Sequence, residues 1–264
     1  MLRANHKLVV ANWKMNPESI REAREMLQLV KRALRTLKKV EAVVCPPAFF
    51  LYELARGNIL SNLHFGGQDA FWEKSAAGAY TGQLSPVMFK KAGAEYLILG
   101  HSETRHLGAT DALVNRKLKA ALAAELKVIL CVGEQERDER GAYFKTIQNQ
   151  LTEDLKNIPR KFFARLIVAY EPLWALSTQG RGPDTPQDFL EQAIFIRKIV
   201  STYVGNHLAV RTPVLYGGSV DHKNAEGFLT VGEADGLLVG RASLRPDYFV
   251  EILKIAAASY DYQV

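Results

Sequence analysis

The sequence predicts an α/β protein, a single-domain (β/α)8 barrel with eight parallel strands. Three observations lead to this fold class. Short runs rich in β-branched and aromatic residues occur eight times in 264 residues, longer segments with helical periodicity separate most of them, and no linker or low-complexity stretch divides the sequence. Eight strands in 264 residues give a repeat of about 33, the size of a strand, its loops and a crossover helix. We therefore expect residues 1–264 to form one domain.

The expected strands are short and almost wholly apolar. Such a run is typical of a strand that is buried on both faces, as in a parallel sheet covered by helices. In chain order the expected strands span residues 7–10, 41–45, 60–65, 95–99, 127–132, 165–170, 213–216 and 235–239.

Helical periodicity fills most of the intervals between these strands, most clearly at 20–37, 111–126, 141–155 and 186–204. Three pairs of residues place a capping side chain before a proline at a first helical position: Asn16-Pro17, Ser85-Pro86 and Thr185-Pro186. Alternation of strand and helix predicts a parallel sheet with crossover helices. Eight such units favour closure into a barrel, with an open, doubly wound sheet as the alternative.

Glycine-rich turns favour the barrel over the open sheet. An open sheet that binds a dinucleotide carries its glycines after the first strand, whereas here they follow the seventh strand, at Gly217-Gly218-Ser219, and the eighth, at Gly240-Arg241. In barrels, the loops after strands seven and eight commonly bind phosphate through backbone N–H groups. Phosphate is therefore the ligand group that these turns predict.

The composition narrows the class of partner. A formal net charge of +6 permits an anionic partner, but Lys and Arg are mixed with Asp and Glu, and the densest basic patch, residues 31–39, has the spacing of a solvated helix face. We therefore expect that nucleic acid is not a partner of this protein. No apolar stretch reaches the roughly 20 residues of a membrane span, and no secretory signal is visible, so we expect a cytoplasmic protein without a membrane partner. Cys45 and Cys131 have no metal-ligand or redox spacing and are expected to be small buried residues.

Polar side chains that suit acid–base chemistry follow three other strands. Asn12 and Lys14 follow the first strand, His101 the fourth and Glu171 the sixth. The carboxyl ends of barrel strands meet on one face, so these side chains should converge. Pro172 ends the sixth strand and restricts Glu171 to extended backbone, which fixes the direction of the carboxylate. No pair of histidines has metal-ligand spacing, so we expect no metal.

Seven longer segments carry more specific information than these single residues. They span residues 12–16, 78–82, 100–103, 131–134, 169–175, 215–220 and 235–240. The most specific of them contains Tyr170-Glu171-Pro172-Leu173-Trp174-Ala175. In order, and over about residues 7 to 255, these segments resemble the triosephosphate isomerase family.

The resemblance implies a TIM barrel that interconverts dihydroxyacetone phosphate and glyceraldehyde 3-phosphate through an enediolate, in glycolysis and gluconeogenesis, without a cofactor. It implies that Glu171 is the general base and that His101 is a neutral electrophile. Asn12 and Lys14 would bind the substrate and stabilise the developing oxyanion. Backbone N–H groups of Ser177, Ser219, Gly240 and Arg241 would hold the phosphate, with support from Ser102, Glu103, Tyr216, Gly217 and Gly218.

The partners implied by the resemblance are a small phosphorylated triose as substrate and a second copy of the chain. The segment 78–82 resembles the loop through which this family dimerises. Thr81 would then reach toward the partner subunit's active site.

Three segments depart from the usual family pattern. Residues 177–181 read Ser-Thr-Gln-Gly-Arg where Gly-Thr-Gly-Lys is usual, so we expect the C-terminal hinge of the lid over the site to close differently. Arg241 stands where Gly is common, and its side chain is expected to turn outward. Thr104 stands where Arg is usual, and the segment after it lacks the usual Glu, so the loop after His101 must be held in another way.

Two other functions are compatible with parts of the sequence. The glycine turns alone would allow a barrel that acts on a different sugar phosphate. The altered lid alone would allow a barrel retained as a binding or scaffold protein, although a scaffold has no need of a base opposite an electrophile.

Overall fold

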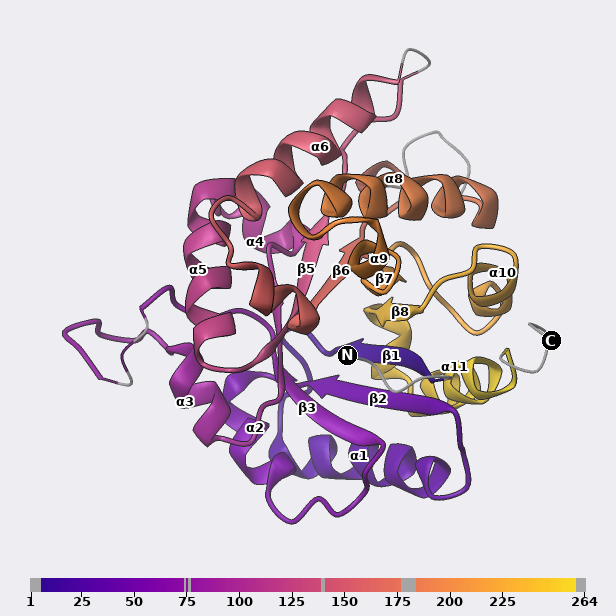
Figure 1. Ribbon diagram of the computed structural model, residues 1–264. Helices are drawn as coiled ribbons and strands as arrows, with labels where there is room; N and C mark the ends of the chain where they lie inside the picture. The colour runs from indigo at the N-terminus through magenta and orange to yellow at the C-terminus, as the bar shows by residue number, and fades with distance from the viewer. Residues whose placement is uncertain (1–5, 74, 76, 139–140, 177–183, 260–264) are drawn as a thin grey trace.

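Within the part of the chain that the structure describes, eight parallel strands close into a barrel surrounded by helices (Figure 1). This computed structural model describes residues 6–73, 75, 77–138, 141–176 and 184–259. Each strand pairs with the next in the chain, and β1 also pairs with β8. The predicted (β/α)8 barrel is thereby confirmed. The strands are β1 (Lys7–Asn12), β2 (Val40–Cys45), β3 (Leu63–Gly67), β4 (Tyr96–Leu99), β5 (Lys127–Val132), β6 (Leu166–Tyr170), β7 (Val214–Tyr216) and β8 (Gly236–Val239).

The helices cover the outside of the barrel (Figure 1). The longer ones are α1 (Ile20–Leu34), α5 (Asp111–Ala123), α6 (Ala142–Asp154), α8 (Pro186–Val204) and α11 (Pro246–Ala258). Shorter helices are α2 (Ala48–Ala55), α3 (Pro86–Lys91), α4 (Ser102–His106), α7 (Leu173–Leu176), α9 (Asn206–Ala209) and α10 (Ala225–Thr230), together with the 3-10 helices η1 (Arg160–Arg165) and η2 (Arg241–Leu244).

Two apolar layers explain why the strands are apolar on both faces. Successive side chains of a strand point to opposite faces. In β1, Leu8 and Val10 belong to the cluster inside the barrel, while Val9 and Ala11 pack in the larger cluster between strands and helices. Cys45 and Cys131 lie in the inner cluster, and both are free and buried, as predicted.

Two of the three predicted helix starts are confirmed. The side chains of Ser85 and Thr185 accept backbone N–H groups of Met88 and Asp188, at 3.3 Å and 3.1 Å, and a proline follows each cap. The start predicted at Asn16-Pro17 is wrong. Helix α1 begins at Ile20 because the hydroxyl of Ser19 accepts the N–H of Glu22 at 3.2 Å.

The third strand was also placed too early, at 60–65 instead of Leu63–Gly67. Its last two residues are glycines, which have low strand propensity. Tight packing explains them, since a Cβ atom on Gly66 would lie 2.7 Å from the sulfur of Cys45, and one on Gly67 would lie 2.6 Å from Leu97. The remaining differences from the predicted bounds, such as the ends of α1 and α5, amount to a turn or less at element termini.

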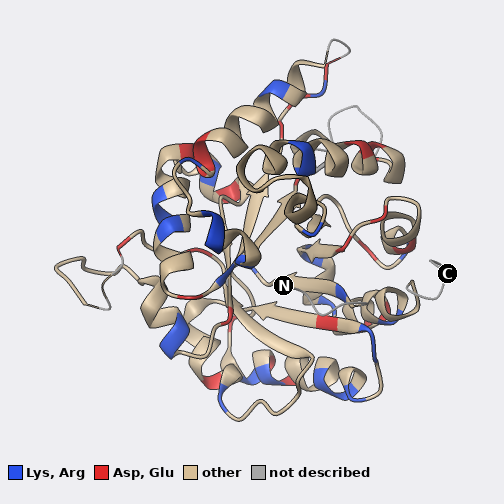
Figure 2. Cartoon of the chain, in the orientation of Figure 1, with Lys and Arg blue, Asp and Glu red and all other residues tan. Residues whose placement is uncertain are grey.

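The distribution of charge agrees with the mixed sequence. In Figure 2, Lys and Arg lie among Asp and Glu on the helices around the barrel. None of the helices within the described residues combines the length and the apolar character that crossing a bilayer requires.

Candidate active site

A cavity of about 590 Å³ lies at the carboxyl ends of the strands. Eleven of the residues predicted for the site line it, and they come from five separate parts of the chain. They are Asn12, Lys14, His101, Ser102, Glu103, Glu171, Gly217, Gly218, Ser219, Gly240 and Arg241. The structure therefore brings together the cation, the imidazole, the carboxylate and both glycine turns.

Glu171 is held rigidly at the end of β6. Its backbone N–H donates to Val132 O at 2.8 Å, and only 2% of the residue is exposed. One carboxylate oxygen, Oε2, accepts the backbone N–H of Ser102 at 3.0 Å, and the other, Oε1, lies 3.4 Å from Nε2 of His101. Gly133, directly after the end of β5, is required for this position, because a Cβ atom there would lie 1.9 Å from the carbonyl oxygen of Glu171.

His101 caps the N-terminus of α4 with its own ring. Its Nδ1 accepts the backbone N–H of Glu103 at 3.2 Å. A ring nitrogen that accepts an N–H carries no proton, so this contact assigns the proton of a neutral ring to Nε2. A neutral His101 ring therefore directs its N–H toward Glu171 and the cavity.

The backbone of Lys14 has φ of 53°, a left-handed conformation that is rare for residues other than glycine, and its side chain lines the cavity. Two amides hold that turn: the side chain of Asn12 accepts the N–H of Lys14 at 3.1 Å, and the side chain of Gln68 donates to the carbonyl of Lys14 at 2.7 Å. The Lys14 ammonium forms an ion pair with Glu103 at 2.6 Å. Gln68 was not identified from the sequence, since a single glutamine after the third strand gives no signal there.

The two glycine turns border the same cavity from β7 and β8. Gly218 allows the first turn to fold over Tyr216, because a Cβ atom there would lie 2.3 Å from the Tyr216 hydroxyl. Tyr216 itself is buried and stacks on Phe228 with ring centroids 3.6 Å apart, so it supports the turn without lining the cavity. Arg241 is exposed at the edge of the cavity.

Some of the predicted residues are not among the described residues that line this cavity. Ser177, Gln179 and Gly180, on which the expectations about phosphate and the lid hinge depend, are outside the described residues. Thr81 is exposed and belongs to the segment between β3 and α3 that extends away from the barrel (Figure 1).

Glu134 is a supporting residue that lies in the segment 131–134 but for which no role was predicted. It is 1% exposed, and its Oε1 accepts the Tyr170 hydroxyl at 2.7 Å and the Trp174 indole N–H at 2.8 Å. Burial raises the pKa of Glu134, and these two hydrogen bonds oppose that rise. The carboxylate thereby ties the end of β6 to α7, directly after Glu171.

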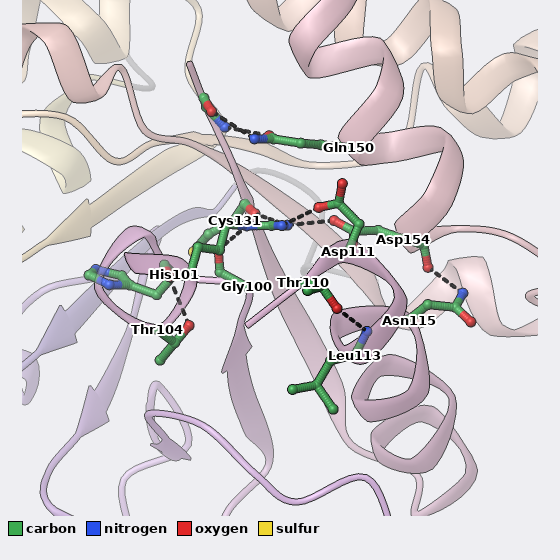
Figure 3. A network of polar contacts seen from close by, with 12 residues as sticks. Gly100, His101, Thr104, Thr110, Asp111, Leu113, Asn115, Cys131, Gln150 and Asp154 are labelled. Atoms are coloured by element: carbon green, nitrogen blue, oxygen red, sulfur yellow. Dashed lines mark hydrogen bonds and ion pairs between the residues drawn. The ribbon is translucent and has the colours of Figure 1, made fainter. Parts of the chain in front are cut away.

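The loop that carries His101 is held by Thr104, which Figure 3 shows beside it, and by Arg105. The Thr104 hydroxyl donates to the carbonyl of His101 at 2.8 Å, and Nε of Arg105 donates to the carbonyl of Gly100 at 2.7 Å. Arg105 also pairs with Asp111 and, at 2.7 Å, with Asp154. Burial raises the pKa of Asp154 to about 7, although the charge of Arg105 acts in the opposite direction.

A barrel with a buried carboxylate opposite an imidazole, beside a lysine and two glycine turns, is typical of enzymes that perform acid–base chemistry on phosphorylated substrates. Within the described residues, no group of three or more His, Cys, Asp or Glu could hold a metal ion.

Comparison with known proteins makes this class specific. A family model described as triosephosphate isomerase matches residues 7–256. Proteins named triosephosphate isomerase from Caldanaerobacter subterraneus subsp. tengcongensis and Dehalococcoides mccartyi are each 39% identical to this chain, over 93% and 95% of it and over 98% and 96% of their own lengths. One from Aquifex aeolicus is 36% identical over 94% of this chain and 98% of its own. The chain belongs to the triosephosphate isomerase family and is therefore an isomerase.

Proposed function

We propose that this protein interconverts dihydroxyacetone phosphate and glyceraldehyde 3-phosphate, a reaction of glycolysis and gluconeogenesis, with the residues of the described cavity. The observation that carries this proposal is the position of the Glu171 carboxylate, 3.4 Å from Nε2 of His101 in a cavity bordered by Lys14 and both glycine turns.

In the proposed reaction, Glu171 removes a proton from the carbon beside the carbonyl. The electrons of the C–H bond form the C=C bond of an enediolate, and the carbonyl π electrons move onto oxygen. Glu171 then returns the proton to the neighbouring carbon, and His101 moves protons between the two oxygens. Oε2 of Glu171 accepts the Ser102 N–H at 3.0 Å, whereas Oε1 has no hydrogen-bond partner among the described residues, so Oε1 is the oxygen proposed to take the proton.

The negative charge that develops on the substrate oxygen would be stabilised by the hydrogen-bond donors around it. Nε2–H of His101, the ammonium of Lys14 and the amide of Asn12 would surround the oxyanion. Backbone N–H groups of Ser219, Gly240 and Arg241 would hold the phosphate, and the lid residue Ser177 would add one more. This chemistry requires no cofactor or metal.

The test is a coupled assay with glyceraldehyde 3-phosphate on the purified protein and on Glu171→Gln. Loss of the base is expected to lower kcat by roughly 10²–10⁴-fold, the usual contribution of a positioned acid–base group. Glu226→Gln, which changes an exposed glutamate on α10, is the matched control and should leave kcat unchanged. Turnover of Glu171→Gln within tenfold of the wild type would exclude Glu171 as the base, and folded protein without any isomerisation would favour the scaffold function.

The proposed active form is a homodimer. Its support is a group of large apolar side chains exposed at the carboxyl end of the barrel, with Met15 92% and Phe49 89% exposed. Near the protruding segment, Phe71, Trp72 and Tyr80 form an aromatic cluster with centroids 4.8 to 5.9 Å apart. A cytoplasmic location stays a prediction from composition, which cell fractionation tests.

A further inference from the structure

A second cavity, of about 420 Å³, lies at the opposite end of the barrel from the active site. It is bordered by the first residues of β5 and β6, the segment before β7, the 3-10 helix η1 and helix α9. Because all strands are parallel, these strand starts lie at the end away from Glu171 and the glycine turns. The two cavities share no lining residue among those described.

The floor of this cavity is apolar and deep. Phe163, Leu166 and Ile167 line it and are all buried, with Leu208 and Pro213 beside them. Ile167 belongs to the cluster inside the barrel, so the cavity reaches the first layer of the barrel interior. A concave apolar surface of this volume lies in the range that small organic ligands occupy.

The rim of the same cavity is strongly basic. Five cationic side chains surround the apolar floor, and none of the described lining residues is acidic. They are Lys127, Arg160, Lys161, Arg165 and Arg211.

Most of the hydrogen-bonding capacity of this rim is unused. Arg160 donates to the carbonyl of Val204 at 2.9 Å, which fixes its side chain without neutralising it. Lys127 donates to the hydroxyl of Tyr96 at 3.0 Å, and its charge also helps to lower the pKa of Glu95. Arg165 lies 3.8 Å from the exposed carboxylate of Glu125. Among the described residues, no carboxylate pairs with Lys161 or Arg211, and the nearest printed partner of Lys161 is the ring of Phe162, at 5.2 Å.

We propose that this cavity binds a small organic anion with an aromatic body, such as an aryl sulfonate or aryl carboxylate. The aromatic body would displace water from Phe163, Leu166 and Ile167, and the anionic group would face Lys161 and Arg211 at the rim. An inorganic anion would leave the floor uncovered, and a neutral aromatic would leave the cations without a partner. The proposal does not depend on the isomerase reaction, because the site lies at the other end of the barrel.

Calorimetric titration with naphthalene-1-sulfonate tests this proposal, and 1-naphthol, with the same ring and no sulfonate, is the control ligand. We expect one sulfonate bound per chain and at least tenfold weaker binding of 1-naphthol, since a hydrogen bond to a charged group is worth about a factor of ten or more. An excess of inorganic phosphate, which would occupy the active site, should not displace the sulfonate.

Three variants of the full chain locate the binding. The double variant Lys161→Glu, Arg211→Glu should weaken sulfonate binding at least tenfold, and Ala164→Trp, which fills the mouth of the cavity, should remove it. Arg35→Glu, at an exposed cation beyond the end of α1, should change it less than twofold. Circular dichroism and unchanged isomerase turnover establish that each variant is folded. Equal affinity for 1-naphthol, displacement by phosphate, or full binding to the folded double variant or to Ala164→Trp would overturn the proposal.

Discussion

At the scale of single residues, one short turn of backbone orients both of the groups proposed to react, Glu171 and His101. The N–H of Ser102 binds Glu171, and the N–H of Glu103 binds Nδ1 of His101, at 3.0 Å and 3.2 Å. The same two contacts fix the direction of the carboxylate and the tautomer of the ring. Preorganised groups of this kind contribute to catalysis because they need no reorganisation when charge develops.

Gly133 provides the most direct residue-scale prediction besides Glu171→Gln. In Gly133→Ala, the new Cβ would meet the Glu171 carbonyl at 1.9 Å, so the end of β6 must move. Because misplacement of a reacting group by about 1 Å can cost 10²-fold, we expect kcat/KM of the folded protein to fall by about that factor. The coupled isomerase assay measures it.

The control for Gly133→Ala is Gly236→Ala. Its Cβ would meet the carbonyl of Leu8 at 1.8 Å, an equally close strand contact away from the cavity. Both variants should be less stable, but only Gly133→Ala should lose activity per folded molecule. Equal activities would show that Gly133 is needed for packing alone.

At the scale of elements, the residue before the N-cap of α8, Asp184, is a buried carboxylate that should make stability depend on pH. Desolvation raises the pKa of Asp184 to about 7 from 3.8, with Asp188 adding to the rise and Arg137, at 3.5 Å, opposing it. Because the folded-state pKa lies above the unfolded value, the folded state holds its proton more tightly. The contribution of Asp184 to stability is therefore greatest at low pH and is lost as pH rises from about 4 to about 7.

Asp184→Asn should remove this pH dependence. We expect the difference in unfolding free energy, variant minus wild type, to increase between pH 5 and pH 8 in urea titrations. Asp247→Asn, at an exposed carboxylate whose pKa is lowered by Arg245, should show no such increase. If the difference in unfolding free energy for Asp184→Asn stays constant or decreases as pH rises, the pKa of Asp184 is not raised in the folded state.

The sequence predicted elements where a local rule decides their position. Thr185 and Pro186 give a capping side chain and a first-turn proline, and α8 runs over residues 186–204 as expected. The end of β3 could not be predicted, because its last two residues are Gly66 and Gly67. Glycine is needed there for close packing against Cys45 and Leu97, which only the folded chain brings near.

The site, like the fold, was predictable only where the position of a residue next to a strand decides its place. Lys14, His101 and Glu171 follow strands, and a barrel gathers strand ends, so their convergence could be predicted without coordinates. Their supports could not be. Gln68 holds Lys14 from 54 residues away, and Asp154 pairs with Arg105 across 49 residues, contacts that no spacing rule identifies.

At the scale of the whole molecule, the barrel separates two kinds of binding surface. The carboxyl end of the strands carries the polar cavity proposed as the active site, and the opposite end carries an apolar cavity with a basic rim. The apolar layer inside the barrel lies between them, so a ligand at one end has no direct contact with the other. That residues 1–264 fold as one unit stays a prediction, which a single calorimetric unfolding transition would support.

The last prediction concerns assembly. Phe49, at the start of α2 after the carboxyl end of β2, is 89% exposed on the same end of the barrel as Met15 and the protruding segment. If this surface pairs two chains, Phe49→Asp buries a charge in the interface, which is strongly unfavourable. Sedimentation at micromolar concentration should then give a dimer for the wild type and a monomer of 29.5 kDa for the variant.

The control variant is Ile59→Asp. Ile59 is 91% exposed and lies before β3, so it is at the opposite end of the barrel, and this variant should remain a dimer. A monomeric wild type would contradict the proposed dimer. Dissociation of both variants alike would contradict the location of the dimer contact at Phe49.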